Sequence, residues 1–422
     1  MTKNIKELCA SKPVAIFGTG ASGAAAKRLF DSLGIEAVFY AESGAELFDS
    51  NAARRHALVV YSPAFRPGHP WIAEAQKNGS LAICEPDLSA LAWRGKIYAI
   101  TGTNGKTTIT KFLAHAFSLA GFGAVAAGNV GKPLSAFCAE LDGGGGGKIA
   151  ICELSSFQTS NLRFLKPDAL LWTNFAPDHL DWHKDMREYF FAKFNIVEAA
   201  LGKPIVAGSS VAQAAKEYGA ELPAGVEIFD ESLKCSAPEP FSSSIQARNF
   251  AMAEMLAKKI GLSRESLLKA AESFSLPEYR FSAPEEIGGI RFYNDSKATN
   301  AHAAIAALEE LAGENDLIWI GGGKDKNCDI EELAGAVAKR AKAAVLIGQT
   351  AEKLKSALSG RLARGAHVCG SMGEAVRKAA ELAKKGSCVL FSPGFSSFGM
   401  FKGYADRGKS FKNEVLCLKN LK

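Results

Sequence analysis

The amino-acid sequence predicts an α/β fold of three domains, each a mostly parallel sheet with flanking helices. Short apolar runs rich in β-forming residues alternate along the whole chain with longer segments of helical periodicity. Glycine-rich turns join a strand to a helix at 18–23 and again at 102–107. The 422 residues are enough for two to three domains, each with a core of its own.

Ten apolar runs are the candidate strands, and two breaks in composition separate them into three groups. The segment 85–96 precedes the second glycine-rich turn, and 275–289 carries two prolines and a diglycine before a new strand. We therefore expect domains at 1–92, 93–276 and 277–422. The candidate strands are 14–18, 58–62, 97–101, 149–153, 169–173, 204–208, 290–294, 317–321, 344–348 and 388–392.

Composition excludes several classes of protein. The N-terminus lacks the features of a signal peptide and no segment has the apolar length of a membrane span, so we expect a cytoplasmic protein without a membrane partner. The nine cysteines are scattered and form no C-x-x-C pair, which argues against a disulfide framework or a zinc cage. The net charge of +6 is dispersed, so no nucleic-acid partner is expected. No heptad stands out, which favours a monomer.

The first glycine-rich turn has the pattern G-x-G-x-x-G, formed by Gly18, Gly20 and Gly23 between a strand and a helix. Such a turn cradles a diphosphate at the helix N-terminus. Glu42 follows at about the spacing of a ribose-binding acid, so an NAD-dependent enzyme is one reading of this domain. The same loop could hold any other diphosphate.

The second turn is the strongest signal in the sequence. A strand at 97–101 leads into glycines, a lysine and threonines, and an amphipathic helix follows. Backbone N–H groups of such a loop face phosphate oxygens, Lys106 would reach the outer phosphates, and the Thr107 hydroxyl would lie on Mg²⁺. Ile100 stands where the full phosphate-loop pattern has its first glycine. The loop residues are Gly102, Thr103, Asn104, Gly105, Lys106, Thr107 and Thr108.

Polar residues follow the next two strands at the same expected sheet edge. Glu153 ends the strand 149–153, where a carboxylate could serve Mg²⁺ beside the phosphates. The segment 173–183 then supplies Asn174, Asp178, His179, Asp181 and His183. A zinc site of two histidines four residues apart is weakly indicated, because the glutamate of H-E-x-x-H is missing.

Taken alone, two residues near this cluster are predicted to lie at the surface. We expect His183 to be exposed. Lys193 lies in an aromatic-rich helical segment, where a lysine is more often at the surface with its charged end in water.

Three segments taken together resemble the ATP-binding domain of the Mur ligases and of the related folylpolyglutamate synthases. They are GTNGKTT (102–108), ELSSFQ (153–158) and TNFAPDHLD (173–181). The resemblance implies that ATP phosphorylates a substrate carboxylate and that the amine of an amino acid attacks the acyl phosphate. It also implies that Lys106 holds the transferring phosphoryl group and that Thr107 and Glu153 serve one Mg²⁺. His179 would help to bind a second Mg²⁺, completed by a carbamylated Lys193.

The C-terminal third contains N-D-S-K-A-T-N (294–300), which is similar to a segment of the same family. The resemblance implies that Asp295 contacts the nucleotide, while Lys297 and Thr299 face the incoming amino acid. Arg280 occupies the place of an arginine that meets ATP phosphates when the domains close. Asn249 resembles an asparagine that touches adenine, although Arg248 replaces the histidine that usually precedes it.

The segments 318–330 and 390–411 most resemble the D-glutamate-adding members of the family. By that resemblance Lys326, Thr299 and Ser397 would bind the carboxylates of D-glutamate, with Tyr404 packed beside them. The other substrate would be UDP-N-acetylmuramoyl-L-alanine, contacted by Ser22 at its diphosphate and by Asn129 at its muramoyl or diphosphate portion. The residues that contact uracil are not indicated, because 39–44 matches the family poorly.

The sequence leaves three other functions as alternatives. The chain could add L-alanine or a diamino acid, or could act as a folylpolyglutamate synthase, although the diphosphate-type domain at 1–92 speaks against the latter. A nucleotide-dependent sensor without catalysis is the alternative from another class. It is disfavoured by the presence of Lys106, Glu153, His179 and Lys193.

Overall fold

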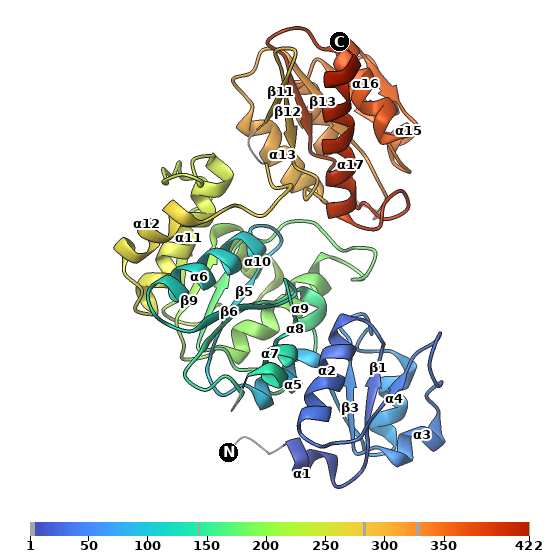
Figure 1. Ribbon diagram of the computed structural model, residues 1–422, viewed down its shortest axis with the longest axis vertical. Helices are drawn as coiled ribbons and strands as arrows, with labels where there is room; N and C mark the ends of the chain where they lie inside the picture. The colour runs from blue at the N-terminus through green and yellow to red at the C-terminus, as the bar shows by residue number, and fades with distance from the viewer. Residues whose placement is uncertain (1–4, 142–143, 282–283, 326–329, 422) are drawn as a thin grey trace. The chain divides into compact units, whose positions relative to one another are not determined.

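A computed structural model describes residues 5–141, 144–281, 284–325 and 330–421. The chain divides into two compact units, and each is described by itself. The first comprises the residues up to Phe175 together with Arg187–Glu239 and Arg248–Phe274, and the second comprises Ala176–Met186, Pro240–Ala247 and the residues from Ser275 on. The first unit contains two sheets and the second contains one (Figure 1). None of the described helices is long and apolar enough to span a membrane.

The first sheet is all parallel, with the strand order β2-β1-β3-β4. Successive side chains of each strand point to opposite faces of the sheet. Phe17, Tyr61 and Cys84 lie on one face and pack with α3 and α4. Helices α2 and α5 also contact strands of this sheet, and both contact α7 (Leu134–Glu140). The elements are α1 (Ile5–Cys9), β1 (Val14–Phe17), α2 (Ala21–Ser32), β2 (Ala37–Tyr40), α3 (Ser50–Arg55), β3 (Leu58–Tyr61), α4 (Pro70–Lys77), β4 (Leu81–Cys84) and α5 (Glu85–Ala92).

The second sheet is also all parallel, in the order β10-β9-β8-β5-β7-β6. Strand β5 lies between β8 and β7, so the carboxyl ends of these three strands are neighbours. The elements are β5 (Lys96–Thr101), α6 (Lys106–Leu119), β6 (Ala124–Gly128), α7 (Leu134–Glu140), β7 (Ile149–Glu153), α8 (Ser156–Thr159), β8 (Ala169–Trp172), α9 (Met186–Ala199), β9 (Ile205–Gly208), α10 (Ser209–Tyr218), β10 (Glu227–Phe229), α11 (Ser244–Lys259) and α12 (Arg264–Ser273).

The third sheet has the order β11-β12-β16-β13-β14-β15, and β11 is its one antiparallel strand. Leu317 and Trp319 of β13 pack with α13, α14 and α15, whereas Ile318 and Ile320 pack with α16 and α17. Helices α16 and α17 run side by side (Figure 1). The elements are β11 (Glu285–Ile287), β12 (Ile290–Asn294), α13 (Ala301–Glu310), β13 (Leu317–Gly321), α14 (Glu331–Arg340), β14 (Ala343–Leu346), α15 (Ala351–Ala357), β15 (Ala366–Val368), α16 (Met372–Leu382), β16 (Cys388–Phe391), α17 (Tyr404–Cys417) and η2 (Leu418–Leu421).

The predicted fold class is confirmed: two sheets are parallel, one is mostly parallel, and helices flank all three. Each of the ten expected strands is present, with ends that differ by at most two residues. The segment 85–96 is more ordered than a connecting segment would be, because α5 occupies most of it and is largely buried.

Candidate active site

The phosphate loop connects β5 to α6 at the centre of the second sheet, and its backbone requires glycine. Gly102 has a φ of +140°, and a Cβ atom there would lie 1.9 Å from the Thr173 hydroxyl oxygen. Helix α6 begins within this loop, at Lys106. The helix N-terminus therefore points its free N–H groups toward the carboxyl edge of the sheet, where they can bind an anion.

The loop is braced by the residues that follow β8. The Thr173 hydroxyl donates to the Asn104 carbonyl oxygen at 2.6 Å, and the Asn104 N–H donates to the Asn174 side-chain oxygen at 2.9 Å. The Thr103 N–H donates to the Asn174 carbonyl oxygen at 3.0 Å. Sequence reasoning missed Thr173. Its place at the end of a strand beside the expected phosphate loop is the signal that could have found it.

Glu153 joins the loop to the neighbouring strand. Its carboxylate is 2% exposed and accepts hydrogen bonds from the Thr107 hydroxyl at 2.7 Å and from the Asn129 amide at 3.0 Å. The structure thus brings together the two residues expected to serve one Mg²⁺. Asn129, expected at the muramoyl or diphosphate portion of the substrate, lies at the same carboxylate.

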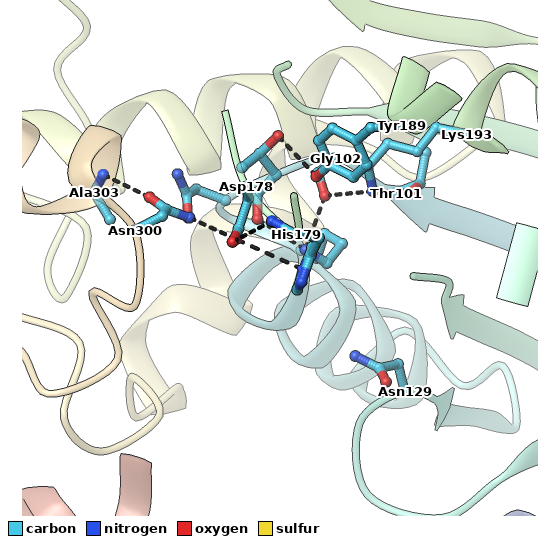
Figure 2. A network of polar contacts seen from close by, with 12 residues as sticks. Thr101, Gly102, Asn129, Asp178, His179, Tyr189, Lys193, Asn300 and Ala303 are labelled. Atoms are coloured by element: carbon cyan, nitrogen blue, oxygen red, sulfur yellow. Dashed lines mark hydrogen bonds and ion pairs between the residues drawn. The ribbon is translucent and has the colours of Figure 1, made fainter. Parts of the chain in front are cut away.

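Two lysines converge on one carbonyl oxygen of the loop. The Lys106 ammonium donates to the carbonyl oxygens of Gly102 at 2.8 Å and Thr103 at 2.9 Å. The Lys193 ammonium donates to the same Gly102 oxygen at 3.0 Å, as Figure 2 shows. Two cationic groups therefore lie at the turn where a triphosphate would bind.

Lys193 is buried, so the prediction of a surface lysine, made from its helical segment alone, is wrong. It is 1% exposed, and its ammonium lies 5.1 Å from the centre of the Tyr189 ring one helical turn earlier in α9. The Tyr189 hydroxyl in turn contacts the Thr103 hydroxyl at 3.2 Å. Sequence reasoning missed Tyr189, although its spacing of four residues from Lys193 places both on one helix face.

In the second unit, Asp178 and His179 form a local group with Asn300. The Asn300 amide donates to the Asp178 carboxylate at 2.9 Å and its oxygen accepts from the Ala303 N–H, which caps α13 (Figure 2). His179 has a φ of +58°, its N–H donates to Asp178, and its Nε2 lies 3.6 Å from the same carboxylate. The expectation of an exposed His183 is wrong, because its side chain is 1% exposed.

The N-D-S-K-A-T-N segment begins at Asn294, the last residue of β12, at the carboxyl edge of the third sheet. Asp295 is 8% exposed and accepts a hydrogen bond of 2.8 Å from Ser392, which follows β16. Burial raises the pKa of Asp295 to about 7, against the opposing effects of the Ser392 hydrogen bond and of the Arg280 charge. Arg280, the expected phosphate-binding arginine, lies between Tyr279 and Phe281, which both have left-handed backbone conformations.

Arg407 of α17 ties the expected amino-acid-binding loops together. It is 1% exposed and donates to the Ser296 hydroxyl and carbonyl oxygens and to the Phe395 carbonyl oxygen. Burial lowers its pKa to about 9. The Lys297 ammonium lies 4.2 Å from the centre of the Tyr404 ring, so two expected substrate residues are in contact. Sequence reasoning missed both Arg407 and Asn300.

Ser397 and Arg407 line a cavity of about 280 Å³ at the ends of β13, β14 and β16. Gly322, Gly323 and Gly348 also line it, as do the exposed side chains of Phe398 and Met400. Thr299 is half-buried one residue before the cap of α13. Lys326, expected to bind a carboxylate of D-glutamate, lies outside the described residues.

Asn249 and Ser22 remain from the expected contacts. A Cβ atom at Gly105 would lie 2.5 Å from the Asn249 side-chain oxygen, so Asn249 is against the phosphate loop. Ser22 is half-buried in the first turn of α2. The G-x-G-x-x-G loop, which contains Ser22, is tightly closed, because a Cβ atom at Gly23 would lie 1.9 Å from the Gly18 carbonyl oxygen.

The oxygen atoms at the phosphate loop suit Mg²⁺, which takes part of its ligands from phosphate and water, better than a metal ion that needs all its ligands from the protein. Among the described residues, no group of three or more histidines, cysteines and carboxylates could hold a metal ion. Magnesium needs only one or two carboxylates, with phosphate oxygens and water for its remaining positions. The Thr107 hydroxyl and the Glu153 carboxylate, 2.7 Å apart, meet that requirement.

Comparisons with known proteins agree along nearly the whole chain. Residues 100–227 match the Mur ligase middle domain, and 279–395 match the Mur ligase glutamate ligase domain. A UDP-N-acetylmuramoylalanine–D-glutamate ligase of Aquifex aeolicus is 32% identical over 95% of this chain and 97% of its own length. The ligase of the same name from Caldanaerobacter subterraneus is 32% identical over 97% of this chain and 99% of its own.

Solved structures share the fold at lower identity. A UDP-N-acetylmuramate-alanine ligase of Thermotoga maritima superposes with a TM-score of 0.59 at 16% identity, covering 97% of this chain and 100% of its own. A second ligase of that organism, MurF solved with ADP, gives a TM-score of 0.60 at 15% identity over 89% of this chain and 97% of its own.

Proposed function

This chain belongs to the Mur ligase family, and we propose that it adds D-glutamate to UDP-N-acetylmuramoyl-L-alanine at the expense of ATP. The observation that carries the proposal is the near full-length similarity to D-glutamate ligases. The phosphate loop, with Lys106, Thr107 and Glu153 at one sheet edge, supports it by offering a place for the triphosphate.

The first step is attack of the substrate carboxylate on the γ-phosphorus of ATP. A carboxylate oxygen forms the new P–O bond, the bond to the β-phosphate oxygen breaks, and ADP leaves. Lys106 and the N–H groups at the start of α6 offset the negative charge that spreads over the phosphoryl oxygens. Positioning is the main contribution, because two anionic reactants must be held in line.

Magnesium would be held by Thr107 and Glu153, and when bound it supplies positive charge to the phosphates. Asn129 donates to the second Glu153 oxygen and so holds that carboxylate in place. Release of the Thr107–Glu153 hydrogen bond would free an oxygen of each residue for the ion.

Lys193 would act as a carbamate. Its neutral amine attacks carbon dioxide, loses a proton and becomes an anionic oxygen donor. The support is the meeting of Lys106 and Lys193 at the Gly102 oxygen, because like charges so close together oppose each other. A carbamate would replace that repulsion with attraction and would give a second Mg²⁺ a hard ligand.

The second step is attack of the D-glutamate amine on the acyl phosphate carbon. Phosphate leaves and the amine gives up a proton as the amide forms. Lys297, Thr299 and Ser397 are the proposed contacts of the amino acid, with Lys326 beside them. Arg407 fixes the loops that carry Lys297 and Ser397 through its bonds to Ser296 and Phe395. We place the reaction in the cytoplasm, where ATP is supplied, and propose that the chain acts as a monomer.

Phosphate release in the presence of ATP and Mg²⁺ tests the proposal. UDP-N-acetylmuramoyl-L-alanine with D-glutamate should give rapid release of phosphate and a product heavier by one glutamyl group in mass spectrometry. L-glutamate, L-alanine and a diamino acid should give none. Release with L-alanine and the precursor lacking the alanine would contradict the proposal, as would binding of nucleotide with no turnover for any amino acid.

A further inference from the structure

Glu85 is a buried carboxylate that joins the first sheet to a helix of the central domain. It directly follows β4 and is the first residue of α5. Its side chain is 2% exposed, and one carboxylate oxygen accepts from the Ser89 hydroxyl at 2.6 Å and from the Ser135 hydroxyl at 2.5 Å. The same oxygen accepts from the Ser135 N–H at 3.2 Å. Because Ser135 is the second residue of α7, Glu85 satisfies an N–H group that the helix itself leaves unpaired.

The loop before α7 lies against Glu153, the carboxylate proposed to bind Mg²⁺. The Gly128 N–H donates to the Lys132 carbonyl oxygen at 3.1 Å, which closes the loop on itself. The Asn129 N–H donates to the Glu153 carbonyl oxygen at 2.9 Å, and the Asn129 amide donates to the Glu153 carboxylate at 3.0 Å. A Cβ atom at Gly128 would lie 2.3 Å from the same carbonyl oxygen. A shift of α7 would therefore move Asn129 relative to the Glu153 carboxylate.

The start of α7 is packed on all sides. Leu134, Ser135 and Ala136 are each 0% exposed. The helix contacts α5 and also α2, which begins inside the G-x-G-x-x-G loop (Figure 1). Close-packed interiors transmit small displacements instead of absorbing them. Glu85 thus lies at one end of a continuous path from α5 through α7 to Asn129 and Glu153.

We propose that Glu85 is a positioning residue for the Mg²⁺ site, an inference that rests on the proposed function. Glu85 holds the start of α7, α7 holds the loop that carries Asn129, and Asn129 orients the Glu153 carboxylate beside Thr107. A metal ligand works only when the residues behind it hold it to within about 0.5 Å. Without Glu85 the Ser135 N–H has lost its buried acceptor, and the start of α7 moves to recover one.

Calorimetric titration with a non-hydrolysable ATP analogue, with and without Mg²⁺, tests this assignment. The ratio of the two affinities is the Mg²⁺ enhancement, and it should be large in the wild type. Asn129→Ala should lower it about tenfold, as expected for loss of a group that orients a metal ligand. Glu85→Ala should lower it about fivefold and leave the affinity without Mg²⁺ unchanged. The double variant should lose no more than Asn129→Ala alone, because both residues act along one path.

Asp87→Ala is the matched control. This carboxylate lies two residues later in α5, is 0% exposed, and accepts from the N–H groups of residues 163–165 instead of α7. Its loss also leaves buried N–H groups without an acceptor, so it should lower Tm as Glu85→Ala does and leave the Mg²⁺ enhancement unchanged. Ser135→Ala removes only the hydroxyl bond to Glu85 and keeps the assignment testable if Glu85→Ala does not fold. It should lower the enhancement about twofold.

Three results would overturn the inference. They are an unchanged Mg²⁺ enhancement in both Glu85→Ala and Ser135→Ala, an equal loss in Asp87→Ala, and losses of Glu85→Ala and Asn129→Ala that multiply in the double variant. A wild type whose affinity for the analogue does not respond to Mg²⁺ would also overturn it. D-glutamate-dependent turnover by the wild type reports on the proposed function separately, because the binding measurement needs no amino acid.

Discussion

The Gly102 carbonyl oxygen accepts hydrogen bonds from two lysines, Lys106 and Lys193, so two positive charges lie close together at the phosphate loop. Lys193 is 1% exposed, so its ammonium loses most of its hydration, and its contacts include the Gly102 carbonyl oxygen, the Thr101 hydroxyl at 3.5 Å and the face of the Tyr189 ring. Burying a cation beside another cation costs free energy unless a binding partner or a modification compensates for it. The phosphates of ATP would compensate Lys106, and carbamylation would compensate Lys193.

We predict that activity depends on carbon dioxide. Enzyme dialysed in buffer purged of carbon dioxide should lose activity and regain it on addition of bicarbonate, with a carbamate signal in carbon-13 NMR when labelled bicarbonate is used. Lys193→Ala should lower kcat on the order of 100-fold, since one charge contact at a reacting phosphoryl group is worth a few kcal/mol. That variant should not respond to bicarbonate, and a wild-type response equal to that of the variant would disprove the modification.

We predict that the contribution of Asp295 to the stability of the second unit decreases as pH rises. Its folded pKa is about 7, raised from 3.8 by burial, so the folded state binds the proton more tightly than the unfolded state does. The favourable contribution is complete below about pH 4 and is lost as pH rises through 7. Asp295→Asn can still accept a hydrogen bond from Ser392. It should therefore stabilise the protein more at pH 8 than at pH 5, by on the order of 1 kcal/mol in the free energy of unfolding, which a larger rise in Tm at pH 8 would show.

Asp316 is the matched control for that measurement. Hydrogen bonds from Ser387 and Arg364 lower its pKa despite partial burial, so its contribution is present above its unfolded pKa and is lost only as pH falls below it. Asp316→Asn should destabilise the protein equally at pH 5 and pH 8. A pH-independent effect of Asp295→Asn would contradict the shift assigned to Asp295.

At the scale of elements, the two glycine-rich turns place the helices α2 and α6. We predict that Gly23→Ala lowers stability by about 1–3 kcal/mol, because its Cβ atom would lie 1.9 Å from the Gly18 carbonyl oxygen and would force α2 away from β1. Gly20→Ala is the control, since nothing lies within 4 Å of its Cβ position. Thermal unfolding should separate the two variants, and equal Tm values would contradict the close packing of α2 on the loop.

The strands that the sequence pattern predicted are the buried ones rich in branched and aromatic residues. Of those it missed, β2 (AVFY) and β4 (LAIC) are as apolar as the predicted strands, but β6 reads AVAAG, and β10, β11 and β15 have three residues each, most of them partly or fully exposed. Such strands are held by their neighbours in the sheet more than by their own propensity. Tertiary contacts also explain α5, where the Asp87 carboxylate accepts from the N–H groups of Arg163, Phe164 and Leu165.

The same distinction applies to the site. Lys106, Thr107 and Glu153 follow from the order of strands, because a parallel sheet brings the carboxyl ends of neighbouring strands together. The burial of Lys193 and His183 could not be predicted, since it depends on how their segments pack. Arg407 was missed because its partners, Ser296 and Phe395, lie 111 and 12 residues earlier in the sequence and meet it only in the folded domain.

For the whole molecule, we predict a change of shape on binding, centred on the connection around Arg280. Tyr279 and Phe281 have φ values of +62° and +54°, a conformation that costs bulky residues free energy and is often found at moving segments. Small-angle scattering should give a smaller radius of gyration with a non-hydrolysable ATP analogue and UDP-N-acetylmuramoyl-L-alanine. Arg280→Ala should reduce that change, and a wild type with one radius in both conditions would contradict the hinge.

In the proposed reaction, the phosphate loop of this chain activates a substrate carboxylate, and the amine of D-glutamate then captures the activated group. Isotope transfer tests it most directly, with UDP-N-acetylmuramoyl-L-alanine labelled by oxygen-18 in its carboxylate and with ATP, Mg²⁺ and D-glutamate present. An acyl phosphate passes one carboxylate oxygen to phosphorus, so the released phosphate should carry one labelled oxygen for each amide formed. Amide formation with unlabelled phosphate, or with AMP and pyrophosphate as products, would contradict the account.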